Sequence, residues 1–187
     1  MEGLYKTDAA HQFQDSIEFL LKQTTEYLDN PTNIKWIVIA FQNALQCTCV
    51  FYLDGNDTTQ TAALRTKSAK KWFDWIRDND KEKPKSFLAS PNELFKRCLK
   101  KDERDLSPLA VSTQRLINLR NNFAHFYPTS LLVELSGFKK ILLDVINAID
   151  IISQMPRMYR HRISRGDFII VANNIVEIRI AIMKLPT

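Results

Sequence analysis

The chain has 187 residues, of which 45% are hydrophobic and 25% charged, and its formal net charge is +5. This composition is that of an ordinary soluble globular domain, long enough to enclose a core. Its four glycines are too few for the tight turns of a sheet-rich fold, so helices are favoured. The N-terminal stretch MEGLYKTDAAHQF has no basic head followed by an apolar run, so no secretory signal is expected.

The first two predicted helices cover about 9–29 and 33–53. In the first, apolar residues recur at spacings that give the helix one hydrophobic face. The second is the longest apolar stretch of the chain, but it carries a lysine and three amide side chains. Since such polar groups are costly in a lipid bilayer, a buried core helix is predicted and no membrane partner is expected.

A long connection, about 54–107, follows and carries thirteen Lys and Arg against ten Asp and Glu. It holds two shorter predicted helices, near 66–78 and 91–101, and the second of these begins with a Ser-Pro helix start. In the first, the sequence KKWFDWIR interleaves aromatic side chains with Lys70 and Lys71, a mixture that can stack bases and bind the phosphates of RNA. An amphipathic helix that fastens the connection to the rest of the fold explains the same pattern.

The third and fourth predicted helices cover about 108–127 and 130–153. The fourth has a strongly apolar face with spacings of three and four. Together with the first two helices they predict an all-α fold, a four-helix up-down bundle within residues 1–156. The connection 54–107 is then a long, charged, helical insertion between the second and third helices.

Residues 157–187 are interpreted as a basic C-terminal arm. From 154 to 187 the chain carries six Lys and Arg against two Asp and Glu. RNA is a natural partner for such an arm, although a solvated basic surface has the same composition. Farther along, the alternation from Ile178 to Ile182 after two asparagines predicts a β-hairpin. The arginines expected to bind RNA here are Arg157, Arg160, Arg162 and Arg165.

The three cysteines are Cys47, Cys49 and Cys98. An odd number, in a chain without a predicted secretory signal, indicates a reducing, cytoplasmic setting. Cys47 and Cys49 are two positions apart on a predicted helix, which turns them about 200° from each other. They are therefore expected to fill the core, and no metal or other cofactor is predicted.

The segment NLRNNFAHFY combines an arginine, a run of amides and a histidine. On a helix, Arg120 falls within the stripe of apolar side chains, where a guanidinium is costly unless an anion or a strong acceptor meets it. The polar face holds amides that lead to one imidazole, whereas a solvated face would normally mix Glu and Lys. These polar residues are Gln114, Asn118, Asn121, Asn122 and His125. An ion pair between Arg120 and another helix, with His125 simply ending its own helix, fits the same sequence.

The sequence LRNNFAHFYP resembles the signature of HEPN domains. In that signature an arginine and a polar residue precede a histidine near the end of the third helix of a small bundle. Arg120, Asn121 and His125 match these positions, with four residues between the arginine and the histidine. The resemblance covers about residues 9–153, while the charged connection and the C-terminal arm depart from the family pattern.

This resemblance implies a metal-independent endoribonuclease, an activity common among toxins and defence proteins, in which a homodimer brings two motifs into one cleft. His125 would transfer protons, Arg120 would hold the scissile phosphate and Asn121 would orient the histidine or bind a phosphate oxygen. Asn118 and Asn122 would contact the RNA. The implied products carry 2′,3′-cyclic phosphate and 5′-hydroxyl ends, and a neutralising antitoxin or regulatory protein is a further implied partner.

Two other functions fit the same residues. A HEPN-like module could bind nucleic acid or a nucleotide without cleaving it, and a plain helical domain could act as a protein-interaction adaptor. The intact motif favours cleavage over binding alone. An Arg120 buried in a salt bridge would favour the adaptor.

Overall fold

The computed structural model describes residues 8–55, 61–78, 82–101, 107–124, 137–154 and 163–185. Most of these residues are helical, which confirms the all-α class. Within these ranges no strand forms, and an isolated antiparallel bridge between Leu64 and Leu88 is the one β-type pairing. The helices are α1 (Ala9–Asp29), η1 (Pro31–Asn33), α2 (Ile34–Gly55), α3 (Thr66–Arg77), α4 (Pro91–Lys101), α5 (Ser107–Ala124), α6 (Phe138–Ser153) and α7 (Arg165–Met183).

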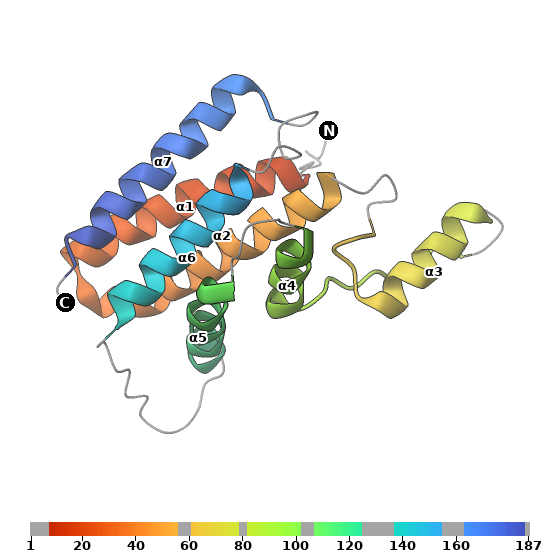
Figure 1. Cartoon of the computed structure of the whole chain (residues 1–187), viewed down its shortest axis with the longest axis horizontal. Coiled ribbons are helices and arrows are strands. Elements are labelled where there is room, and N and C mark those ends of the chain that lie inside the picture. The colour runs from red at the N-terminus through yellow and green to blue at the C-terminus, as the bar shows by residue number, and fades with distance from the viewer. Residues whose placement is uncertain are drawn as a thin grey trace, which may run out of the picture.

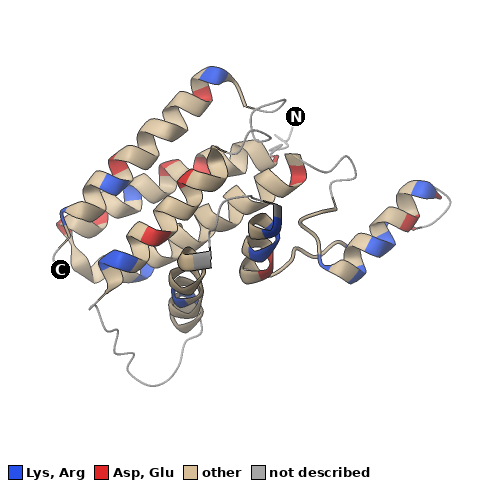
Figure 2. Cartoon of the chain, in the orientation of Figure 1, with Lys and Arg blue, Asp and Glu red and all other residues tan. Residues whose placement is uncertain are grey.

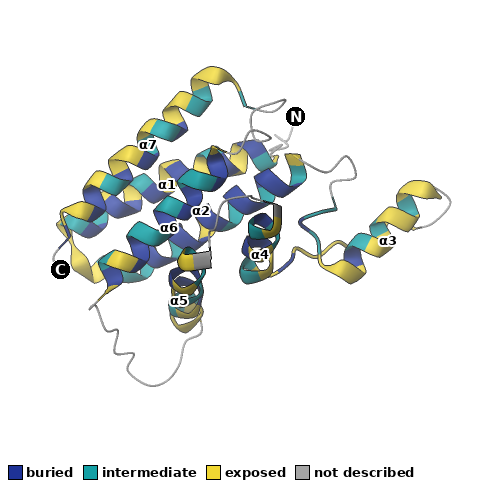
Figure 3. Cartoon of the chain, viewed as in Figure 1, coloured by how far each residue is buried: buried dark blue, intermediate teal, exposed yellow. Residues whose placement is uncertain are grey.

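Four helices, α1, α2, α6 and α7, lie side by side and form the body of the molecule (Figure 1). Their facing sides are buried, whereas their outer sides are exposed (Figure 3). Phe13 of α1 stacks on Phe51 of α2 with 5.4 Å between the ring centroids. Leu142 and Ile146 of α6 are fully buried in the same core. The apolar spacing of these helices therefore builds one continuous core.

α2 lies at the centre of this body, since it packs on α1, α4, α5 and α6. Together with η1 it forms the stretch Pro31–Gly55, the one part of the described chain long and apolar enough to cross a membrane by length and composition. Inside the fold, 67% of the most apolar window of this stretch is buried. The predicted burial of the second helix is therefore observed.

The C-terminal arm contains the helix α7 where a β-hairpin was predicted. Ser164 caps this helix by accepting a hydrogen bond from the Asp167 N–H at 3.1 Å. Its buried side chains recur at spacings of three and four. They are Val171, Ile175, Ile178, Ala181 and Ile182. The hairpin prediction is wrong because the alternation over 178–182 is brief, whereas the helical spacing extends over the whole segment and packs on the core.

α7 also changes the composition of the bundle. The predicted bundle used α1, α2, α5 and α6, but α5 is seen nearly end-on in Figure 1 and runs across α2 and α6. α7 packs on α1 and α6, and an ion pair from Arg179 to Asp150, at 2.7 Å, joins it to α6. Because α2 and α6 run in the same direction, the side-by-side helices do not alternate up and down in chain order (Figure 1).

α3 stands away from this body (Figure 1). Two extended segments, one before α3 and one after it, run past each other at its base. The Arg65 N–H donates to the carbonyl of Phe87 at 2.8 Å, and the Ala89 N–H donates to that of Ala63 at 2.9 Å. Residues 61–78 and 82–89 together are called the α3 appendage below.

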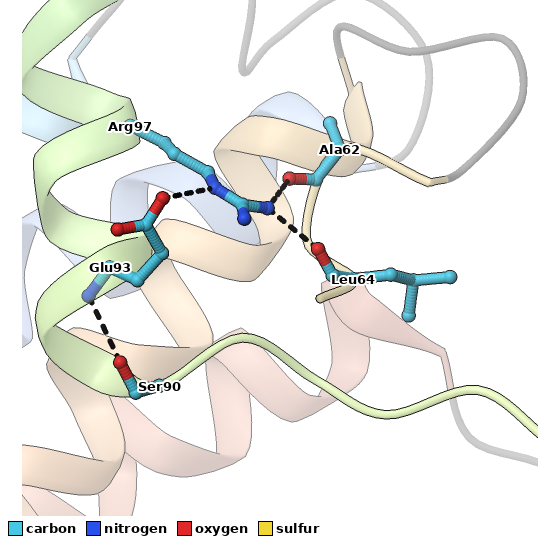
Figure 4. Close-up of polar contacts among 5 residues, drawn as sticks. All are labelled: Ala62, Leu64, Ser90, Glu93 and Arg97. Carbon is cyan, nitrogen blue, oxygen red and sulfur yellow. Dashed lines mark hydrogen bonds and ion pairs between the residues drawn. The ribbon is translucent and has the colours of Figure 1, made fainter. Parts of the chain in front are cut away.

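Arg97 of α4 fastens this appendage to the body. Its guanidinium donates to the carbonyls of Ala62 at 2.8 Å and Leu64 at 2.7 Å (Figure 4). Glu93, one turn earlier on α4, holds the same guanidinium at 3.0 Å. Ser90 accepts a hydrogen bond from the Glu93 N–H at 3.3 Å, which confirms the helix start predicted for this segment.

Candidate functional site

α5 carries the motif segment, and its inner face is set by contact with α2 and α6. The buried residues of that face are Ser112, Thr113, Leu116 and Ile117. Arg120 follows Leu116 by four positions and Ile117 by three, so it continues the same stripe near the end of the helix. It is half-buried, and the one hydrogen bond that its guanidinium makes among the described residues lies at the surface. Of the predicted stripe, Leu116 and Ile117 are buried, whereas Arg120 is half-buried and Ala124 is exposed.

A polar contact fixes α5 against α6. The hydroxyl of Ser112 donates to Oδ2 of Asp144, and the same carboxylate pairs with Lys140 at 2.6 Å. The Asp144 carboxylate is therefore bonded to Ser112, which lies about two turns before Arg120 on α5, and to Lys140. This contact fixes the position of α5 along α6, and therefore the position of the motif residues on α5 relative to α6.

The guanidinium of Arg120 meets an amide within its own helix. Its Nη1 donates to Oδ1 of Asn121 at 3.4 Å, a long hydrogen bond. No ion pair joins Arg120 to a carboxylate within the described ranges of the chain. The salt bridge that would favour an adaptor is therefore not formed in this part of the structure.

The outer face of α5 presents the amides as predicted. Asn118, Asn121 and Asn122 are exposed, and Oδ1 of Asn118 accepts a hydrogen bond from Nε2 of Gln114 at 2.9 Å. Amides bonded to each other along a helix keep donors and acceptors available to a polar ligand. The structure thus places Arg120, Asn121 and Asn122 on the last two turns of α5.

Other predicted site residues lie apart or beyond the described ranges. His125, Arg157, Arg160 and Arg162 lie outside the described residues. Arg165 is exposed in the first turn of α7, at the opposite edge of the body from α5 (Figures 1 and 2). It therefore cannot act on a ligand phosphate held by Arg120 of the same chain.

Lys70 and Lys71 are both exposed on α3, which lies away from α5 (Figure 2). Lys71 lines a cavity between α3 and the segment that follows it, together with Arg65, Lys67 and Lys85. Lys70 does not line this cavity. Sequence reasoning found Lys71 but missed the other three cations, whose clustering depends on how the chain returns past α3.

The cysteines Cys49 and Cys98 are buried, as expected, and Cys47 is half-buried. The Sγ of Cys98 lies 3.9 Å from the carbonyl oxygen of Cys49. Two effects raise the pKa of the Cys49 thiol well above its ordinary value: the larger is a hydrogen bond with Cys98, and the smaller is burial. This thiol therefore stays protonated. In the described ranges, no group of three or more His, Cys, Asp or Glu side chains could hold a metal ion.

No protein-family model matches this chain, and neither a curated protein nor a solved structure does. The geometry of α5 and of the α3 appendage is therefore the basis for a functional conclusion.

Proposed function

We propose that this chain is a metal-independent endoribonuclease of the HEPN type that acts as a homodimer. The position of Arg120 supports this proposal most strongly. It is a half-buried cation beside a surface made of amide side chains. Since no carboxylate of the described ranges pairs with it, its donors can meet a phosphate.

In the proposed reaction, RNA supplies the nucleophile, which is the 2′-hydroxyl next to the scissile phosphate. One copy of His125 takes the proton of that hydroxyl, and the second copy donates a proton to the departing 5′-oxygen. Arg120 stabilises the charge on the phosphorane with its planar fork of donors. The 2′-oxygen to phosphorus bond forms as the bond from phosphorus to the 5′-oxygen breaks, which leaves a 2′,3′-cyclic phosphate and a 5′-hydroxyl.

Asn121 has a positioning role in this proposal. It already contacts Arg120, and from the same place its amide can bind a phosphate oxygen or orient His125. Asn118 and Asn122 are exposed beside it and would contact ribose or base.

The dimer must bring two α5 helices together. α7 lies at the opposite edge of the body (Figure 1), so a dimer formed through α7 would keep the two Arg120 side chains apart. We therefore assign the dimer contact to the end of α5. A neutralising or regulatory protein of the kind that accompanies cytoplasmic toxins would cover the same surface.

Comparison of wild type with Arg120→Ala and Arg115→Ala tests this proposal. Arg115 is an exposed arginine on the outer side of the same helix, so Arg115→Ala controls for the loss of one positive charge. We expect wild type and Arg115→Ala to cleave end-labelled RNA at similar rates and Arg120→Ala to cleave it far more slowly while remaining folded. Equal cleavage by all three proteins would refute the proposed role of Arg120.

A second candidate is a module that binds nucleic acid or a nucleotide without cleaving it. The cation-lined cavity of the α3 appendage favours this function, because it does not involve Arg120. RNA that is retarded on a gel by wild type but never cleaved would support this second candidate.

A further inference from the structure

The α3 appendage has an open, solvent-accessible cavity of about 600 Å³ between the start of α3 and the segment 82–87. Four of the eight residues that line it are cations, and none is acidic. Its volume is in the range of sites that hold small ligands. These cations are Arg65, Lys67, Lys71 and Lys85. A cavity with this lining attracts an anion.

The N-terminal end of α3 forms one wall of the cavity. The cap residue Arg65 makes no side-chain capping bond, and the first turn has no acidic residue. The first backbone bond of the helix runs from the Ala69 N–H to the carbonyl of Arg65, at 2.8 Å. The N–H groups of Thr66, Lys67 and Ser68 have no acceptor among the described residues. Unpaired N–H groups at the positive end of a helix dipole are suited to bind a phosphate.

Ser68 gives an independent indication of a ligand. It lines the cavity and is only 6% exposed. A serine within a helix commonly bonds a carbonyl one turn earlier, but the Ser68 hydroxyl has no hydrogen-bond partner in the described part of the chain. Thr113 Oγ1 is the one fully buried side-chain polar atom without a partner among the described residues, so the Ser68 hydroxyl is still accessible from the cavity. From there it can donate to a bound oxyanion.

Two tryptophans extend this wall by one turn of α3. Trp72 follows Ser68 by four positions and Trp75 follows Lys71 by four, so the two tryptophans share a helix face with these lining residues. Neither ring lines the cavity itself. The two rings are half-buried, with 5.2 Å between their centroids. The ammonium of Lys83 lies 5.3 Å from the Trp72 ring centroid, so a flexible cation occupies a place where a base could stack.

We infer that this cavity binds the phosphate group of a nucleotide, whose base lies against Trp72 and Trp75. The phosphate is held by the N–H groups at the start of α3, by the Ser68 hydroxyl and by Lys71 and Lys85. Four residues of helix, a rise of about 6 Å, separate Ser68 from Trp72, and this distance suits the reach of a single nucleotide. A free nucleotide and a nucleotide within single-stranded RNA share this chemistry. The site does not depend on cleavage by α5.

Tryptophan fluorescence tests this inference directly. The chain has three tryptophans, and Trp36→Phe leaves only the pair on α3. In this background we would titrate adenosine monophosphate and, separately, a 5′-phosphorylated oligoribonucleotide, with inorganic phosphate as a competitor. Saturable quenching that phosphate reverses is expected. Saturation by the mononucleotide identifies a free nucleotide as a ligand, whereas quenching by the oligoribonucleotide alone identifies RNA.

Charge-removing variants then locate the site. Lys71→Gln combined with Lys85→Gln should weaken binding by at least about tenfold, since two charged donors are lost. Both lysines are exposed, so the fold is expected to persist, and circular dichroism checks this. Lys96→Gln combined with Lys100→Gln, at two exposed lysines of α4 outside the cavity, is the matched control.

Two outcomes would overturn the inference. One is the absence of saturable quenching by either ligand. The other is an equal affinity of the Lys71→Gln/Lys85→Gln variant and the Lys96→Gln/Lys100→Gln control. Binding should also persist in Arg120→Ala. Failure of the nucleotide site and failure of the proposed cleavage are therefore observed in separate experiments.

Discussion

The helical body and the α3 appendage differ in how their functional groups are held. In the body, Arg120 lies on a helix whose inner face is buried against α2 and α6. In the appendage, the cations line a cavity whose base is held by a few backbone bonds and by one arginine, Arg97. The body positions a single charge, whereas the appendage gathers several.

This difference corresponds to two kinds of chemistry. Cleavage of a phosphodiester requires a charge held at a fixed place relative to the reacting atoms, and a packed helix supplies that rigidity. Capture of a phosphate requires an excess of positive charge and donors, and it tolerates movement of long lysine side chains. The body is therefore the better place for catalysis and the appendage for binding.

The largest expected effect concerns Arg120. Arg120→Ala should lower the rate of RNA cleavage by about 10²–10³, because a donor to the transition state is lost. Arg120→Lys should recover part of that rate, since the charge remains but the planar fork does not. Single-turnover cleavage rates measure both variants. Nucleotide binding at α3 that fell along with cleavage would contradict the separation of the two regions.

A matched pair of isoleucines compares the stability of the two regions. Ile178 of α7 is fully buried in the body, and Ile76 of α3 is 42% exposed. Ile178→Ala should reduce the free energy of unfolding by about 2–5 kcal/mol. Ile76→Ala should change it by no more than about 0.5 kcal/mol. Urea unfolding followed by circular dichroism distinguishes these values, and similar losses for both variants would show that α3 is part of the core.

Removal of Arg97 should loosen the appendage while the body stays folded. Arg97→Ala leaves the carbonyls of Ala62 and Leu64 without their donor, at a local cost of about 1–3 kcal/mol. Amide hydrogen exchange should then become faster in α3 and remain slow in α1 and α6. Exchange that accelerated equally in all three helices would show that the appendage and the body unfold together.

The smallest expected effect is a loss of stability at alkaline pH. The folded state raises the pKa of the Cys49 thiol, so it keeps a proton that the unfolded state loses. The stabilisation is complete below the ordinary thiol pKa of 9.0 and decreases as the pH rises above it. Cys49→Ala should unfold more easily at neutral pH. Above pH 9.0, however, its free energy of unfolding should decrease less steeply than that of wild type. A decline as steep as in wild type would exclude Cys49 as its source.

Local patterns predicted much of this fold. The helix predicted over 9–29 is α1, and the Ser90 cap marks the start of α4, because apolar spacing and capping are encoded within a few residues. The hairpin prediction failed because the choice between helix and strand for α7 depends on its packing against α1 and α6. Long-range contacts decided that choice.

The candidate site was predicted only where it depends on local sequence and not on long-range contacts. Arg120 and the amides lie on one helix, so their relative positions follow from helical geometry alone. The cavity of the appendage joins Arg65 and Lys71 to Lys85, which comes after the chain has turned back. No local sequence pattern predicts that the chain turns back after α3 and brings Lys85 beside these two residues. His125, the proposed partner of Arg120 in the cleavage reaction, lies outside the described residues.

Identification of the ends left on cleaved RNA tests the central claim most directly. Purified wild type and His125→Ala would be incubated with end-labelled RNA in the presence of EDTA, and the fragment ends would be mapped. Our account predicts cleavage by wild type alone, with 2′,3′-cyclic phosphate and 5′-hydroxyl ends. Fragments with 5′-phosphate ends, or cleavage that stops in EDTA, would contradict it, as would intact RNA under every condition that leaves the protein folded and dimeric.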